Sequence, residues 1–313
     1  MHSKPNCPGC GSQGCAEQPN RFGGARLFQC ETCALQFWDL RDALPDRSWY
    51  DQAVDYEPRY WRLFSSLRDY LQWNHFEVLR SLPAEPLSIL DVGCGLGGFV
   101  AACQRAGHDA YGLDWSERAI AAGRAYFNAN NLFNGTLEEF VRSSTRKKWD
   151  VVTLFEVLEH LEEPRPFISQ IRELLRPGGR LMMSVPNRDR RPNLHDSMDY
   201  PPYHLTWWNT NALRAFLDNN GFQTVTVSGS PAWFSIAAHL HLRTRNLPMV
   251  SSAKRRLAER AANSPKSWIM APLYIRALAR AKQASIAGAA LALSPILGPF
   301  TKPARLLAVA VRQ

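Results

Sequence analysis

The sequence predicts an α/β protein with a doubly wound, Rossmann-like parallel sheet and a small metal-binding module in front of it. Two observations predict the sheet. Apolar, strand-like runs alternate with helical segments between residues 86 and 228, and a glycine-rich turn follows the first run. Two Cys-x2-Cys pairs near the N-terminus predict the module. A length of 313 residues, 45% of them hydrophobic, suffices for one large domain with additions.

Residues 1–40 form the predicted module. Cys7 and Cys10 make one Cys-x2-Cys pair, and Cys30 and Cys33 make the second. Four thiolates at this spacing can surround Zn²⁺ tetrahedrally, and the metal then supplies folding free energy that so short a segment cannot obtain from a core. We therefore expect a structural zinc ribbon with these four ligands; the alternative is four unrelated reduced thiols. The N-terminus "MHSKPNCPGC" has no apolar run of the secretory kind, so we expect a cytoplasmic chain.

Residues 41–84 are rich in aromatic side chains and are predicted to form a helical linker. Apolar residues recur there at helical spacing, which is typical of a helix that packs against a core. The alternative is a lid over a ligand pocket, in which Tyr56, Arg59 or Tyr60 would reach the ligand. The apolar stripe consists of Trp61, Phe64, Leu67 and Leu71.

The main domain is expected to comprise residues 85–235 and 304–313. In such a sheet, ligands bind beyond the carboxyl ends of the parallel strands. The final strand is expected to insert antiparallel beside the preceding one. The predicted strands are residues 88–92, 109–113, 151–155, 180–185, 223–227 and 306–311, and the predicted helices are residues 99–105, 117–127, 166–175 and 210–219.

The stretch "ILDVGCGLGGFV", residues 89–100, contains the glycine-rich turn. Gly93, Gly95 and Gly97 allow the main chain to turn tightly and to approach a ligand closely. Asp114 ends the next strand, where a carboxylate can accept hydrogen bonds from ribose hydroxyls. These features suit either a nicotinamide dinucleotide or an adenosyl cofactor, so the turn alone leaves both open.

Four motifs decide between them because they occur together and in order: "ILDVGCGLGGF", "AYGLDWSERAI", "WDVVTLFEVLEHLEEP" and "LLRPGGRLMMSVPN". Over residues 88–227 the chain resembles the class I S-adenosylmethionine (SAM)-dependent methyltransferases, which have a seven-stranded sheet. The segment "YHLTWWNTNALRAFLDNNGF" resembles the glycan and small-molecule branch of that family. The N-terminal "CPGC", "QCETCALQFW" and "WYDQAVDYEPRYW" resemble the zinc-ribbon leader that many bacterial members carry.

The resemblance implies a SAM site. Asp91 and the glycines would lie under the methionine and ribose parts, Asp114 would hold the ribose, and Trp115 would lie beside the adenine. Cys94 is interpreted as a small residue that fits the turn, because methyl transfer from a sulfonium requires no nucleophilic thiol. The complete predicted cofactor site is Asp91, Gly93, Cys94, Gly95, Gly97, Asp114, Trp115, Thr136, Leu137, Phe155 and Glu156.

Methyl transfer to a hydroxyl or a carbon acid requires a proton acceptor. His204 and His160 are the predicted bases, since a neutral imidazole accepts protons near pH 7. Glu156 and Glu159 are predicted to orient either an imidazole or the amino group of the cofactor. The alternative for each histidine is a hydrogen-bonded structural residue. An Asn/Asp-Pro-Pro-aromatic motif, frequent in methylases of nucleic-acid amines, is absent from "LFEVLEHL", so oxygen or carbon is the expected target.

Residues 236–303 carry most of the net positive charge, with eleven Lys or Arg and one acid, Glu259. Cations four residues apart among Ala, Leu and Ile predict a basic amphipathic helical insertion that contacts an anionic membrane at its inner face. The acceptor would then be a small molecule, a sugar or a lipid-linked glycan. A soluble helical subdomain is the alternative for the insertion. For the whole chain, the alternatives are an RNA methyltransferase, which the modest charge of the ribbon disfavours, and a non-catalytic scaffold that binds cofactor.

Overall fold

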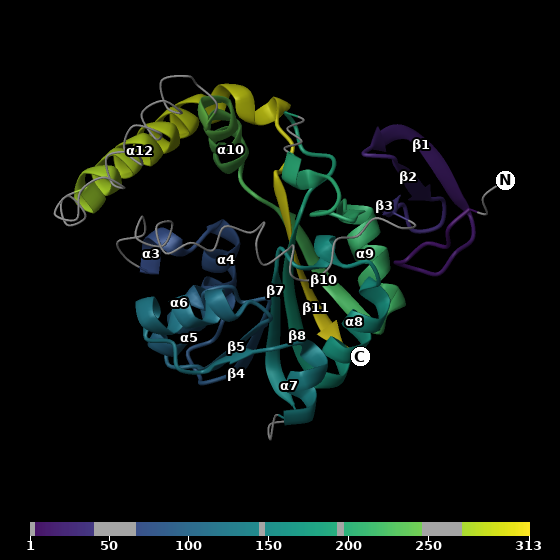
Figure 1. The fold of residues 1–313 in the computed structure, drawn as a ribbon, viewed down its shortest axis with the longest axis horizontal. Helices are drawn as coiled ribbons and strands as arrows, with labels where there is room; N and C mark the ends of the chain where they lie inside the picture. Colours follow the sequence, from purple (N-terminus) through teal and green to yellow (C-terminus); the bar gives the residue numbers. More distant parts are fainter. Residues whose placement is uncertain (1–3, 41–66, 144–147, 193–196, 246–270) are drawn as a thin grey trace.

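The computed structural model describes residues 4–40, 67–143, 148–192, 197–245 and 271–313. Seven strands form its main sheet: β4 (Ser88–Val92), β5 (Asp109–Asp114), β6 (Leu132–Asn134), β7 (Trp149–Phe155), β8 (Leu175–Pro186), β10 (Phe222–Gly229) and β11 (Arg305–Arg312). Their order is β10-β11-β8-β7-β4-β5-β6 (Figure 1). Only β11 runs antiparallel to its two neighbours, β8 and β10. The predicted doubly wound sheet and the insertion of the last strand are both confirmed.

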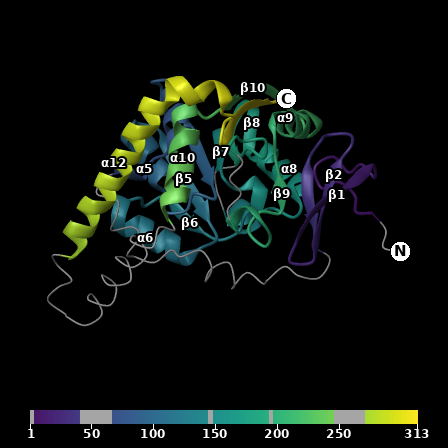
Figure 2. The ribbon, with the colours of Figure 1, turned by 90° about the horizontal axis from the view of Figure 1, so that it is seen from above.

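Helices cover both faces of this sheet (Figure 2). They are α3 (Leu67–Tyr70), α4 (Trp73–Ser81), α5 (Gly98–Arg105), α6 (Glu117–Phe127), α7 (Leu137–Ser143), α8 (Pro164–Leu174) and α9 (Thr210–Asn219). On one face, α4, α5 and α6 enclose a core that contains Val78, Phe99 and Ile120. On the other face, α7, α8 and α9 enclose a second core that contains Phe140 and Ile171. The sheet therefore has the two covered faces that parallel strands require.

Local sequence signals set several helix boundaries. The side chain of Ser116 accepts a hydrogen bond from Ala119 N at 3.3 Å and begins α6, and Asn209 accepts one from Ala212 N at 2.9 Å and begins α9. Both helices have the predicted bounds. Strand β8 begins earlier than predicted, because Leu175 pairs with Trp149 on β7 before the Pro-Gly-Gly turn.

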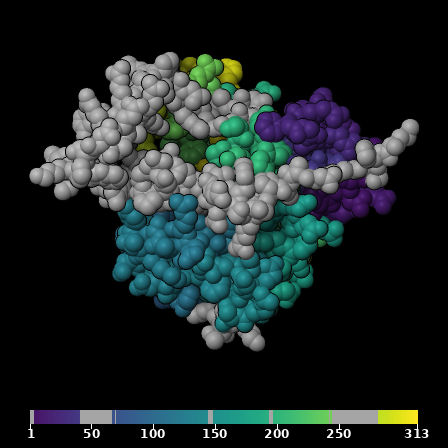
Figure 3. All heavy atoms as spheres, in the orientation of Figure 1, coloured from purple at the N-terminus to yellow at the C-terminus, as the bar shows by residue number. Residues whose placement is uncertain are grey.

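The N-terminal residues form a second, four-stranded sheet. Its strands are β1 (Cys15–Phe22), β2 (Ala25–Cys30), β3 (Gln36–Asp39) and β9 (Thr206–Trp207), in that order. Strand β9 comes from the main part of the chain, so the two parts share a sheet, which the sequence did not predict. Figure 3 shows the N-terminal segment packed directly against that part. We call residues 4–40 the ribbon; the predicted division of the chain into domains stays a prediction.

Among the described residues between β10 and β11, helices α10 (Ala232–Arg245) and α12 (Ala271–Leu297) lie side by side (Figures 1 and 2), and the short helix η3 (Gly298–Phe300) follows α12. They join the sheet where β8 ends, since Arg305 pairs with Pro186. By length and composition, Ala281–Phe300 would suffice to span a membrane, and 6% of its apolar window is buried. The predicted lid residues Tyr56, Arg59 and Tyr60, and the stripe residues Trp61 and Phe64, lie outside the described residues.

Candidate active site

The glycine-rich turn joins β4 to α5 at the carboxyl edge of the sheet. Gly93, Gly95 and Gly97 have φ angles of 76°, 54° and 70°, in the left-handed region that a Cβ atom disfavours. A Cβ atom on Gly97 would lie 2.5 Å from a methyl group of Leu132 on β6. The turn therefore needs glycine both for its conformation and for its close packing, and it leaves bare backbone facing the edge where cofactors bind.

Asp114 fixes this turn. Its Oδ2 accepts a hydrogen bond from Gly95 N at 2.8 Å, and its Oδ1 accepts one from Ser116 N at 2.8 Å. The carboxylate thus ties the turn to the end of β5 and to the start of α6. A carboxylate at this strand end can also accept hydrogen bonds from ribose hydroxyls. Trp115 follows directly and is half-buried, and its place beside an adenine stays a prediction.

Two other residues of the predicted cofactor site are buried beneath the turn. Asp91 accepts a hydrogen bond from Thr153 Oγ1 on β7 at 2.7 Å. Burial, with the nearby charge of Asp114, raises the pKa of Asp91 to about 7. Cys94 is 6% exposed, and burial raises its pKa well above the ordinary thiol value. Cys94 is therefore a neutral thiol, which agrees with its interpretation as a packing residue rather than a nucleophile.

Three further residues of the predicted cofactor site already have structural partners. Thr136 N donates to Glu139 Oε2 at 2.7 Å, while Glu139 N donates to Thr136 Oγ1 at 3.2 Å, so the pair forms a capping box at the start of α7. Leu137 is buried in the core on that face. The ring of Phe155 meets that of His75 edge-on, with 4.6 Å between centroids. Contacts of Thr136, Leu137 and Phe155 with a cofactor stay predictions.

Glu156, directly after β7, is held on both carboxylate oxygens. Ser184 Oγ donates to its Oε1 at 2.8 Å, and Arg305 Nε lies 3.1 Å from its Oε2. Its φ of 56° is unusual for a residue with a side chain, and such backbone strain is concentrated at functional sites. Asn74 on α4 in turn donates to Ser184 Oγ at 2.8 Å. The sequence did not single out Arg305, which reaches the site only through the insertion of β11.

Glu159, His160 and His204 converge on one point, and we call them the acceptor-side group. One ligand atom of each lies within 4.8 Å of the others. The imidazole Nδ1 of His160 lies 2.7 Å from the carbonyl oxygen of Tyr203, so this nitrogen carries the proton and Nε2, 4.0 Å from Glu159 Oε1, keeps a lone pair. Desolvation, and then the neighbouring imidazole of His204, lower the pKa of His160. The imidazole of His160 is therefore available as a proton acceptor, and both rings offer a nitrogen that could bind a metal.

Glu159 is the unusual member of this group. It is 1% exposed, and neither carboxylate oxygen has a hydrogen-bond partner among the described residues. Burial, followed by the charge of Glu156, raises the pKa of Glu159 well above its ordinary value. A buried carboxylate without a partner costs several kcal/mol in order of magnitude. Such a cost is expected where the function of a side chain is to bind a proton, a cation or a substrate.

Asp199 completes the surroundings of His204. It lies in η2 (Ser197–Asp199), and its Oδ1 is 3.5 Å from His204 Nδ1, while its Oδ2 is 2.5 Å from Arg190 Nη2. The indole of Trp207 donates to the carbonyl oxygen of Asp199 at 2.7 Å. The sequence around Asp199 and Arg190 contains no recognisable motif, so sequence reasoning missed both residues.

The four cysteines of the ribbon form a single cluster. Cys7 Sγ lies 3.6 Å from Cys33 Sγ, and Cys10 Sγ lies 3.5 Å from Cys30 Sγ. The Zn–S distance of about 2.3 Å in tetrahedral sites requires sulfur atoms about 3.8 Å apart, so the geometry fits zinc. A hydrogen bond from the Cys33 thiol lowers the pKa of Cys7 to about 5, whereas burial raises the pKa of Cys10 to about 11. The predicted four-cysteine cluster is confirmed.

Comparison with known families gives a clear match. The profile of a family described as "Methyltransferase domain" matches residues 61–227, which is more than half of the chain. The chain belongs to this methyltransferase family. The resemblance to class I SAM-dependent methyltransferases is confirmed, and with it the expectation of a SAM-dependent enzyme at the level of the family. The matched region contains the glycine-rich turn, Asp114 and the acceptor-side group.

Two curated relatives of the methyltransferase are named ubiquinone biosynthesis O-methyltransferase. The one from Actinobacillus pleuropneumoniae is 32% identical over 149 residues, which cover 45% of this chain and 60% of the relative. The mitochondrial one from Schizosaccharomyces pombe is 36% identical over 105 residues, or 32% and 38% of the two chains. The methyltransferase thus spans 60% or less of either relative. A solved structure of a SAM-dependent methyltransferase from Archaeoglobus fulgidus is 17% identical, with a TM-score of 0.46, over 85% of this chain and 100% of that one.

Proposed function

We propose that the methyltransferase transfers the methyl group of SAM to an oxygen or carbon atom of a small-molecule, sugar or lipid-linked acceptor. One observation carries the proposal. A buried, unpartnered carboxylate, Glu159, faces the imidazoles of His160 and His204 at the sheet edge that also presents the glycine-rich turn. An imidazole at this position can take up the proton that an acceptor hydroxyl loses. Both relatives are O-methyltransferases by name, which favours oxygen over carbon as the target.

In the proposed reaction, a lone pair of the acceptor attacks the methyl carbon, and the electrons of the breaking C–S bond neutralise the sulfonium. S-adenosylhomocysteine is the product. Asp114 binds the ribose hydroxyls, and Glu156, fixed by Ser184 and Arg305, orients the amino group of the methionine part. His204 takes up the acceptor's proton, with His160 as the second base. Glu159 orients the imidazoles, so the protein contributes positioning and one proton transfer.

Zinc is proposed as the structural metal of the ribbon, with Cys7, Cys10, Cys30 and Cys33 as ligands. The sulfur distances and the burial of three of these residues support it. The acceptor-side group also offers a carboxylate and two imidazoles, which suit a divalent cation. If adding Mg²⁺, Mn²⁺ or Zn²⁺ to dialysed protein raised the rate, the two histidines would be ligands rather than bases.

Two measurements test the proposed reaction. Calorimetry should detect binding of SAM and of S-adenosylhomocysteine, and Asp114→Ala should weaken both. Purified protein incubated with radiolabelled SAM and a fractionated cell extract should place the label in a lipid, glycan or small-molecule fraction. Label in RNA would favour the RNA methyltransferase, and binding without any labelled product would favour the scaffold. Binding of a nicotinamide dinucleotide, with no heat from SAM, would contradict the proposal altogether.

We also propose that the protein is cytoplasmic and contacts the inner face of the membrane through its C-terminal helices. The charge of residues 236–303 supports this, as do the exposed side chains of Ile296 and Phe300, at 67% and 78%. Both ends of the insertion, β10 and β11, lie in one sheet, so the helices must enter and leave on the same side.

Flotation with anionic vesicles tests the membrane contact. Wild-type protein should float, and the double variant Ile296→Ser/Phe300→Ser should not. The matched control is Val225→Ser on β10. It too removes an exposed apolar side chain, at 56%, but this residue lies outside the insertion. If the double variant and the control floated equally well, the insertion would be a soluble helical subdomain.

A further inference from the structure

The ribbon is bound to the rest of the molecule by a shared sheet. Phe37 on β3 pairs with Thr206 on β9, and the backbone N–H of Trp38 donates to the carbonyl oxygen of Leu205 at 3.0 Å. These are main-chain hydrogen bonds, so their geometry is set by the strand rather than by a flexible side chain. The residue directly before this pairing is His204. The last strand of the ribbon is therefore built into the backbone that carries a member of the acceptor-side group.

The same short strand holds the loop that follows β7. Leu205 N donates to the carbonyl oxygen of Glu159 at 2.7 Å, and Thr206 Oγ1 donates to the carbonyl oxygen of Leu158 at 3.2 Å. Leu158 and Glu159 belong to η1 (Leu158–His160). Strand β9 thus lies between the ribbon on one side and η1 on the other. A displacement of β3 would move His204 and η1 together.

Aromatic packing stiffens this junction. The rings of Trp38 and Trp207 meet edge-on with 5.5 Å between centroids, and Tyr200 lies against both, at 6.0 Å and 5.5 Å. Trp207 also donates its indole N–H to Asp199, the neighbour of His204. Aromatic pairs of this kind contribute about 0.5–1.5 kcal/mol each beyond the area they bury. The loop that carries Asp199 is thereby packed against the ribbon.

Arg188, just after β8, connects the second cysteine pair to the main sheet. Its Nη1 donates to the carbonyl oxygen of Ala34 at 2.5 Å, and its side chain is 10% exposed. Ala34 follows Cys33 and has a φ of 61°, so the turn it occupies is held from outside. Zn²⁺ with four thiolates carries a net charge of −2, which a buried guanidinium offsets.

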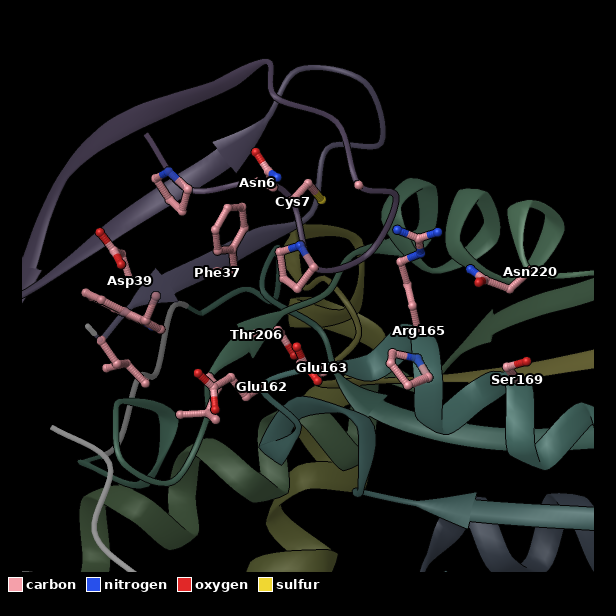
Figure 4. Close-up of a pocket in the computed structure, with 17 residues that line it drawn as sticks. Asn6, Cys7, Phe37, Asp39, Glu162, Glu163, Arg165, Ser169, Thr206 and Asn220 are labelled. Carbon is pink, nitrogen blue, oxygen red and sulfur yellow. The ribbon is translucent and has the colours of Figure 1, made fainter. Parts of the chain in front are cut away.

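The ribbon also forms one wall of an open groove of about 940 Å³ (Figure 4). Asn6 and Phe37 line it from the ribbon, while Glu162, Arg165 and Thr206 line it from the other side. The guanidinium of Arg165 lies so close to Gly11 that a Cβ atom there would be 2.6 Å from Nη1. The two parts are thus in contact beyond the shared sheet, and the groove reaches β9.

We propose that the ribbon positions the acceptor-side group, through the pairing of β3 with β9 and through Arg188, and takes no part in holding SAM. The inference rests on the proposed methyl transfer and on zinc in the ribbon. Arg188 and Trp38 are positioning residues, since they act on Glu159 and His204 through the backbone. Loss of the ribbon's structure should lower turnover of the acceptor while the affinity for S-adenosylhomocysteine stays unchanged, because Asp114 holds the glycine-rich turn through hydrogen bonds from Gly95 and Ser116, whereas β3 of the ribbon pairs with β9.

The first test replaces a zinc ligand in the full chain. Cys33→Ser should lower the bound zinc and reduce kcat about 10-fold or more, as misplacement of catalytic groups by about 1 Å does. Hydrogen exchange should accelerate at residues 204–208 and stay unchanged at residues 93–97. Cys15→Ala is the matched control, because Cys15 is also buried in the ribbon but lies outside the four-cysteine cluster. Unchanged kcat and exchange in a zinc-depleted Cys33→Ser protein would overturn the inference.

The second test leaves the zinc ligands intact and decides the case in which Cys33→Ser unfolds the whole protein. Arg188→Gln should retain zinc by metal analysis and retain affinity for S-adenosylhomocysteine by calorimetry, yet lose kcat, and Arg188→Lys should recover part of it. Arg176→Gln is the control, since it removes an exposed arginine paired with Asp150, the second residue of β7, at the opposite end of that strand from Glu156. If Arg188→Gln turned over as wild type does, the ribbon would not act on the site. If neither variant bound S-adenosylhomocysteine, while the controls did, the proposed independence of the SAM site would be wrong; if the wild type itself did not bind it, the proposed function would fail instead.

Discussion

The two halves of the candidate active site are built in different ways. On the cofactor side, Asp91, the glycine-rich turn and Asp114 lie within one strand-turn-helix-strand unit, and Asp114 is hydrogen-bonded to the turn itself. On the acceptor side, Glu159 and His204 come from separate loops and are aligned by a strand of the N-terminal ribbon. The first half is local in sequence, and the second exists only after the ribbon has docked.

The two halves also differ in how their charges are satisfied. The carboxylate of Asp114 accepts two backbone hydrogen bonds, whereas both oxygens of Glu159 lack a partner among the described residues. A satisfied carboxylate fixes a binding surface in advance of the ligand. An unsatisfied, buried carboxylate is instead primed for a proton or a cation. Substitutions should therefore be able to change cofactor binding and proton transfer separately.

The largest effect is expected from His204→Ala. Removing the proposed proton acceptor should lower kcat by about 10²-fold or more, while calorimetry with S-adenosylhomocysteine should give an unchanged affinity. Kinetics with saturating SAM measures the first quantity. A rate equal to that of the wild type would remove His204 from this role and leave His160 as the remaining base.

Asp114→Asn should have the opposite pattern. The amide offers an N–H group where the carboxylate accepts from Gly95 or Ser116, so a hydrogen bond to a charged group is lost, worth about 1.5–3 kcal/mol. The affinity for S-adenosylhomocysteine should therefore fall by about 10-fold or more, with kcat at saturating SAM largely retained. Should kcat fall while affinity holds, the two halves would not be separable.

Asp91→Asn is expected to change the pH dependence of stability. The folded-state pKa of Asp91, about 7, lies above the unfolded value, so the folded protein binds the proton more tightly and its free energy of unfolding falls as the pH rises towards and through 7. Asparagine can still accept from Thr153 but cannot ionise. Urea unfolding should find the variant more stable than the wild type by at least about 1 kcal/mol at pH 8, with a smaller difference at pH 5. Equal differences at both pH values would contradict the buried ionisation.

The smallest effect is expected from Cys94→Ala. The thiol is buried and neutral, and the reaction needs no covalent intermediate, so kcat should stay within about 2-fold of the wild type and stability should fall by about 1 kcal/mol. Alkylation with and without S-adenosylhomocysteine provides a check, because a neutral buried thiol should react slowly in either state. Loss of activity in this variant would show that the Cys94 side chain, and not only the backbone of the turn, is needed for the reaction.

Much of the cofactor side could be predicted because each of its features leaves a local pattern. The spacing of Gly93, Gly95 and Gly97 reflects left-handed backbone, and the position of Asp114 at a strand end reflects the geometry of one strand-helix-strand unit. The two Cys-x2-Cys pairs likewise predicted the four-cysteine cluster. Arg188 and Arg305 gave no such pattern, because their contacts are with segments more than a hundred residues away in the sequence. Asp199 lies in a loop that has no recognisable sequence motif.

The sequence by itself therefore determined the sheet, the glycine-rich turn with its aspartate, and the four-cysteine cluster. Only the tertiary structure decided that Thr206 and Trp207 would complete the ribbon's sheet, and that Glu159 and His204 would meet. The physical reason is the range of the interactions. Backbone conformation and hydrogen bonds within one unit are encoded by neighbouring residues, whereas strand pairing between distant segments depends on the packing of the whole molecule.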